Sequence, residues 1–113
     1  MNQRISLTLF LAILLDHWKR AEPIRWEKVN DVADFVYFDH SIPVAKGVGC
    51  VSCHGRIDRM RLVRQAESLQ MSWCLGCHRN PERFLRPRSE IFNFAWKAAD
   101  QAALGAALVR DNH

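Results

Sequence analysis

All four cysteines of this chain lie in two C-x-x-C pairs, and a histidine directly follows each pair. The two motifs are Cys50-Val51-Ser52-Cys53-His54 and Cys74-Leu75-Gly76-Cys77-His78. Two thiols at this spacing can form thioether bonds to the two vinyl groups of one haem, and the histidine that follows then ligates the iron. The motifs therefore predict two covalently attached haems c. Cys50, Cys53, Cys74 and Cys77 are the predicted attachment points, and His54 and His78 are the predicted proximal ligands.

Two other interpretations fit the cysteine spacing. A structural four-cysteine zinc site also uses two C-x-x-C pairs about twenty residues apart. It has no need of the histidines, and chance would place one of the five histidines after each pair in about 0.2% of sequences of this composition. A thioredoxin-like redox pair requires a βαβ context that the sequence does not indicate. The histidines favour haem over both alternatives.

His40 is the candidate distal ligand of the first haem iron. It precedes Cys50 by ten residues, and an extended chain of that length reaches about 33 Å, enough to pass round a porphyrin edge. The alternative is a histidine held by hydrogen bonds in a loop. Met71 lies too close to Cys74 to reach the far side of its own haem. The second iron therefore either takes a ligand from outside or stays open, and an open iron would make the chain a haem redox enzyme.

Composition and charge indicate a small folded domain with a basic surface. The chain has 113 residues, 49% of them hydrophobic, and at this size a large cofactor adds much to a small core. Its net charge of +4 suits acidic partners, haem propionates or anionic lipid. Arg56 and Arg79 directly follow the two proximal histidines and are candidates to pair with propionates. Nucleic-acid binding is disfavoured, because no aromatic-basic motif accompanies the charge.

The apolar run from Ile5 to Leu15 is too short to span a bilayer as a helix. It has the length of the apolar part of an export signal, but no small-x-small cleavage site follows it. It is therefore either an uncleaved or misassigned export signal, or a short helix that is buried or faces a partner. We expect three parts: this N-terminal segment over residues 1–22, a dihaem module over 23–94 and a C-terminal helix over 95–113.

Periodicity predicts the local structure between these landmarks. Phe35 to Phe38 is an aromatic and β-branched run that predicts a short strand, and Val44 to Val48 is expected to be a loop. Apolar residues between Met60 and Leu69 recur at helical spacing, and the alanine-rich tail from Trp96 to Val109 favours helix. The expected fold is mainly α with extensive irregular loops, a small multihaem cytochrome c module organised around covalently bound haems.

Several segments resemble the pentahaem cytochrome c subunit of alternative complex III, a quinol:electron acceptor oxidoreductase. They are Asp34-Phe35-Val36-Tyr37-Phe38-Asp39-His40-Ser41-Ile42, Val44-Ala45-Lys46-Gly47-Val48-Gly49-Cys50, Ser68-Leu69-Gln70-Met71-Ser72-Trp73-Cys74-Leu75 and Cys77-His78-Arg79-Asn80-Pro81-Glu82. The resemblance covers about residues 23–112. It implies an electron-carrier subunit, not itself an enzyme, on the periplasmic side of the bacterial cytoplasmic membrane. It further implies iron–sulfur and membrane-integral partner subunits, and a cytochrome c or an oxidase as acceptor in a respiratory chain.

The chain departs from that family in two ways. Family members carry a second histidine three residues after the one matching His40, where this chain has Pro43. Because proline cannot ligate iron, one distal ligand is lost or comes from elsewhere. The family also has further C-x-x-C-H motifs on both sides of the matching region. We therefore expect this chain to correspond to the middle third to half of such a subunit, from a truncated or split reading frame, or to be a natural dihaem derivative.

Overall fold

The computed structural model describes residues 3–111 and is about half helical. Its elements, with η marking a 3-10 helix, are α1 (Gln3–Arg20), α2 (Ser41–Lys46), α3 (Val51–His54), η1 (Ile57–Arg59), α4 (Met71–Arg79), η2 (Pro81–Arg83), η3 (Arg88–Glu90) and α5 (Gln101–Asp111). Within the described residues there is no strand, only an isolated antiparallel bridge between Val48 and Leu85. The expected mainly α architecture with long irregular segments is confirmed.

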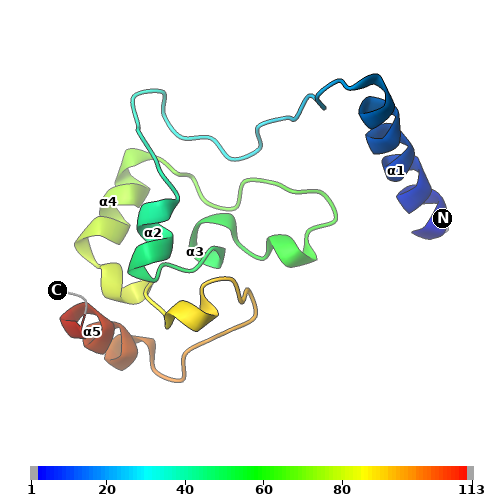
Figure 1. The fold of residues 1–113 in the computed structure, drawn as a ribbon. Coiled ribbons are helices and arrows are strands. Elements are labelled where there is room, and N and C mark those ends of the chain that lie inside the picture. Colours follow the sequence, from blue (N-terminus) through cyan, green and yellow to red (C-terminus); the bar gives the residue numbers. More distant parts are fainter. Residues whose placement is uncertain (1–2, 112–113) are drawn as a thin grey trace.

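Helix α1 lies apart from the other helices, and an irregular segment over residues 21–40 joins it to them (Figure 1). The helix ends where Ala21 adopts a left-handed φ of 52°. The N–H groups of Ala21 and Glu22 donate to the carbonyls of Trp18 and His17, which is the Schellman arrangement that terminates helices. The Trp18 side chain is 82% exposed and that of Leu9 64%. The N-terminal apolar segment is thus a helix, and its described apolar side chains from Leu9 onward are exposed, whereas a buried helix was one of the expectations.

No helix in the described part of the chain is long and apolar enough to cross a membrane.

Two sequence predictions of local structure are wrong. Phe35 to Phe38 form no strand, because no neighbouring strand supplies hydrogen bonds, and Phe35 and Tyr37 are largely exposed. The stretch from Met60 to Leu69 forms no helix. There the Gln65 side chain donates to the carbonyls of Glu67 and Ser68, and Leu69 has a left-handed φ of 52°. Side-chain hydrogen bonds have replaced the helical pattern that the periodicity predicted.

Part of the segment expected to be a loop before Cys50 is helix α2. A carboxylate oxygen of Asp39 accepts a hydrogen bond from the Ser41 N–H at 2.8 Å and so satisfies a donor at the start of the helix. Pro43 lies in the first turn, where its missing N–H costs nothing. The helix ends at Gly47, which has a φ of 84°. Helix α2 therefore fixes His40 at its beginning and directs the chain toward Cys50.

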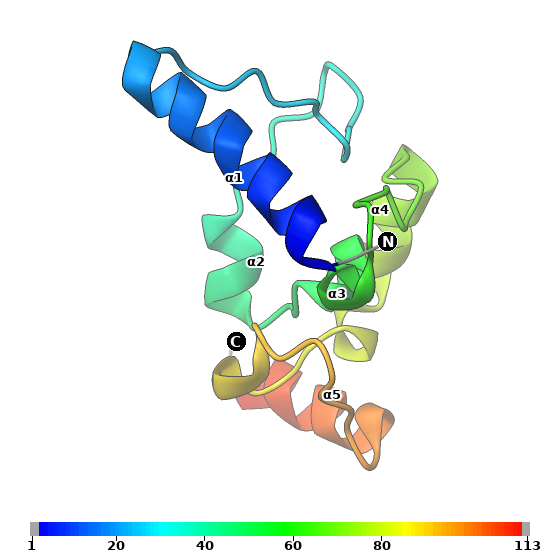
Figure 2. The same ribbon diagram turned by 90° about the vertical axis from the view of Figure 1, so that its right-hand side faces the viewer.

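The core is small and lies beside helix α5. Leu85 and Ile91 are the buried hydrophobic side chains of the described chain. Helix α5 packs against η2, where the Gln101 side-chain amide donates to the carbonyls of Glu82 and Leu85. The helix expected from Trp96 begins only at Gln101, because the Asp100 carboxylate accepts from the Ala103 N–H and sets its start. Helices α5 and α1 lie far apart in both views (Figures 1 and 2).

The molecule is expanded for its length. Its radius of gyration is 18.0 Å, whereas a compact domain of this length has about 13 Å. Its accessible surface is 9619 Å², against about 6,400 Å² for a compact protein of this mass. The polypeptide by itself therefore buries little of its apolar surface.

Candidate haem-attachment sites

Helix α3 and the residue before it hold the first C-x-x-C-H motif. Cys50 is the N-cap of α3 and already has helical backbone angles, with φ −53° and ψ −35°. Its carbonyl accepts hydrogen bonds from the N–H groups of Cys53 and His54. Residues three and four apart lie on one face of a helix, so both thiols and the imidazole share a face. Gly55, with a φ of 64°, ends the helix directly after the motif.

The second motif lies in helix α4. Cys74, Cys77 and His78 have the same spacing within a regular helix and thus also share a face. The indole N–H of Trp73 donates to the Glu67 carboxylate at 3.0 Å, which ties the helix to the loop before it. His78 is exposed. The structure thus gives both motifs the helical conformation that two attachment points and a ligand on one side of a porphyrin require.

The structure brings together His40 and His54, which are fourteen positions apart in the sequence. Their ring centroids are 6.2 Å apart and their planes differ by 11°. Two imidazoles that bind one metal ion from opposite sides, with metal–nitrogen bonds of about 2.0 Å, have ring centroids about 6.3 Å apart. Phe38 contacts His40 edge-on at 4.9 Å between centroids and so orients its ring. The separation of the two ring centroids matches that of two histidine ligands to one six-coordinate iron.

Two of the four thiols have a raised pKa. Burial, with smaller contributions from the neighbouring Cys77 and Cys74, raises the pKa of Cys53 to about 11. Burial also raises the pKa of Cys77. All four cysteines are free. A thioredoxin-like pair needs a thiol of lowered pKa, so the raised pKa values of Cys53 and Cys77 argue against that alternative.

No group of three or more His, Cys, Asp or Glu side chains within residues 3–111 is placed to hold a metal ion. The four thiols lie near one another, since Cys77, Cys74 and Cys50 all raise the pKa of Cys53, but in the described chain they do not form a set of metal ligands. Nor is any aromatic or histidine ring of the described chain paired with the His78 ring. Met71, on the same helix as His78, is 53% exposed. The structure thus places His40 beside His54 of the first motif, and it places no second candidate ligand of the described chain beside His78 of the second motif.

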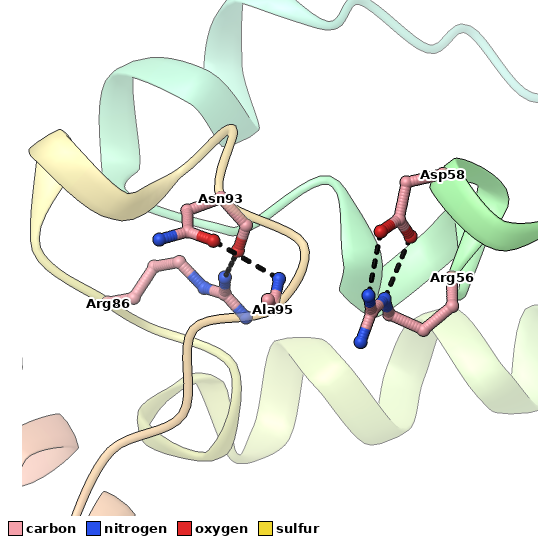
Figure 3. Close-up of polar contacts among 5 residues, drawn as sticks. All are labelled: Arg56, Asp58, Arg86, Asn93 and Ala95. Carbon is pink, nitrogen blue, oxygen red and sulfur yellow. Dashed lines mark hydrogen bonds and ion pairs between the residues drawn. The ribbon is translucent and has the colours of Figure 1, made fainter.

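Two arginines near the sites have roles that the sequence left open. The Arg56 guanidinium binds both carboxylate oxygens of Asp58, at 2.8 and 2.7 Å (Figure 3). Arg56, a candidate partner for a propionate, is thus already engaged. Together with Arg59, Arg61 and Arg64 it lines a cavity of about 590 Å³ directly after the first motif. Arg79 is exposed.

Sequence reasoning missed Arg86, to which it gave no role. Arg86 is only 9% exposed. Its guanidinium donates to the Asn93 carbonyl (Figure 3) and to the Glu90 carbonyl. It also lies over the Trp96 ring, at 5.1 Å from the ring centroid. The only signal in the sequence is its place between Leu85 and Pro87, and neither neighbour predicts a buried charge.

No family model matches this chain, and no curated protein matches it.

Proposed function

We propose that this chain is an electron-transfer module that carries two covalently bound haems c, the first of them ligated by two histidines. The observation that carries the proposal is the pair formed by His40 and His54. Their rings lie at the spacing of two ligands to one iron, beside a helix that presents two thiols on the same face as His54. A second motif of the same kind lies in helix α4.

Each residue of the first site has a defined part. Cys50 and Cys53 hold the porphyrin by thioether bonds, His54 supplies the proximal nitrogen, and His40 supplies the distal one. Haem iron with two nitrogen ligands supplies reversible one-electron transfer and has no open position for a substrate. At this first site the chain accordingly acts as an electron carrier and not as an enzyme. Helix α2 contributes by holding His40 in place before the motif.

At the second site the chain supplies Cys74, Cys77 and His78 but no evident distal ligand. Because His78 is exposed, a haem bound there would lie at the surface, where a neighbouring subunit could supply the distal ligand. The resemblance to the pentahaem subunit of alternative complex III supports a place in a membrane-associated, quinol-oxidising respiratory complex. In that setting the chain works on the periplasmic side of the bacterial cytoplasmic membrane, beside iron–sulfur and membrane-integral subunits, and passes electrons toward a cytochrome c or an oxidase.

The test is to export the chain to a periplasm that contains the haem-attachment machinery, and to record visible spectra and a denatured intact mass. Sharp reduced absorption bands and a mass gain of two haems are expected. Replacing Cys50 and Cys53 by Ser, or Cys74 and Cys77 by Ser, should each remove one haem from the mass. A colourless protein of unmodified mass that binds zinc would overturn the proposal.

A further inference from the structure

Arg86 is a buried positive charge that makes no ion pair within the described residues. Two backbone carbonyls and the face of Trp96, which are neutral groups, contact the guanidinium, and Cys50 and the Glu90 carboxylate act on it only through space. Its Nε atom is buried and has no hydrogen-bond partner. Burial lowers the pKa of Arg86, but an arginine side chain remains charged at neutral pH. Burying a charge without an ion-pair partner costs desolvation free energy, so packing alone does not account for an arginine at this position.

The guanidinium lies against the backbone that leads into the first haem motif. A methyl group at Gly49 would overlap its Nε and Cζ atoms, so the absence of a side chain there makes room for it. Gly49 is bonded to Cys50, a proposed attachment point. The Arg86 N–H also donates to the Gly47 carbonyl at 2.9 Å, and the Cys50 N–H donates to the Ile91 carbonyl at 3.2 Å. The charge is thus fixed within about one residue of Cys50.

We propose that Arg86 raises the reduction potential of the haem attached at Cys50 and Cys53. The inference rests on the proposed function. The ferrous iron carries one positive charge fewer than the ferric iron, so a fixed cation nearby favours the reduced form. Two unit charges about 12 Å apart at an effective dielectric constant of about 20 change an equilibrium constant about tenfold. Through this effect Arg86 favours the reduced state of the first haem, so that an electron delivered to the chain spends more time there.

The experiment is a redox titration of the intact dihaem protein with dithionite and mediators, which deliver one electron to each iron while no bond forms or breaks. The ferric low-spin electron paramagnetic resonance signal of the first haem is followed. Arg86→Gln should lower its midpoint potential by about 59 mV, the equivalent of a tenfold change for one electron. Arg86→Lys, which keeps the charge, should stay near the wild type. Arg88→Gln removes an exposed charge two residues away and should change little.

A structural role for Arg86 predicts a different result. If Arg86→Lys and Arg86→Gln lower the potential equally, or if Arg86→Gln behaves like Arg88→Gln, the charge is not the cause and the inference is wrong. If Arg86→Gln does not fold, Gly49→Ala serves in its place, because the added methyl group displaces the guanidinium. A lowered potential with an unchanged low-spin signal supports the inference, and an unchanged potential overturns it. A wild-type protein without haem would instead refute the proposed function itself.

Discussion

At the scale of single residues, His40 is the side chain on which the first site most depends. Replacing it by Ala removes the proposed distal nitrogen, so one of the two haems should change from low to high spin. The measurement is the visible and electron paramagnetic resonance spectrum of the ferric protein. His17→Ala is the matched control, because His17 lies on the separate helix α1. Identical spectra for wild type and His40→Ala would remove His40 from the ligand set.

Asp39 helps to hold His40, because its carboxylate accepts a hydrogen bond at the start of helix α2. The hydrogen bond from the Ser41 N–H lowers the pKa of Asp39, so the carboxylate stabilises the folded state above its unfolded pKa of about 3.9. That stabilisation is lost as the pH falls through the lower folded pKa. Asp39→Ala should therefore reduce the thermal unfolding midpoint at pH 7, and the difference from wild type should shrink toward about pH 3. Asp34→Ala, another exposed carboxylate, should show no such trend.

The residues of the two motifs could be predicted from the sequence because their chemistry is local. Cys50, Cys53 and His54 are close in the chain, and one helical turn is enough to bring them to one face. The sequence also showed that His40 had the reach to meet His54, but not that the rings would lie parallel. Arg86 could not be found this way, since its burial depends on Gly49 and Trp96, which lie far from it in the sequence.

At the scale of elements, the closest packing is that of helix α5 against η2. A methyl group at Gly105 would overlap the backbone carbonyl of Glu82, which cannot move as a side-chain end could. Gly105→Ala should therefore cost about 1–3 kcal/mol of unfolding free energy. Gly76, in the exposed part of helix α4, has no atom near its missing side chain, so Gly76→Ala should gain about 0.5–1 kcal/mol. Chemical denaturation of the two haem-loaded variants measures both, and equal effects would contradict the packing.

The two elements that the sequence predicted wrongly fail for different physical reasons. Helix α5 could be predicted because alanine favours helix and Asp100 caps it locally. The strand expected over Phe35 to Phe38 needed a partner strand, which the fold does not supply. The helix expected over Met60 to Leu69 met side-chain hydrogen bonds from Gln65 that compete with the helical pattern. Propensity thus failed once because a distant partner strand was missing, and once because local side-chain hydrogen bonds competed with the helix.

At the scale of the whole molecule, the exposed surface and the small core indicate what holds the fold together. Apart from Leu85 and Ile91, the described chain has no buried hydrophobic side chain, and its radius of gyration of 18.0 Å exceeds that of a compact domain. The proposed ligands lie in or directly before helices α2, α3 and α4, but among the described elements the close packing is that of η2 with α5 and α4. A haem has apolar faces of the size needed to join such elements.

The chain without haem should therefore fail to fold cooperatively. Replacing all four cysteines by Ser prevents haem attachment and leaves the proposed ligands His40, His54 and His78 in place. Any loss of stability then comes from the missing haems. Thermal unfolding of this variant, followed by circular dichroism, should be broad, whereas the haem-loaded protein should show one sharp transition. Amide hydrogen exchange should be slow in α3 and α4 only in the loaded form. If the variant unfolds as sharply and at the same temperature, the polypeptide forms its own core, and the haems do not organise the fold.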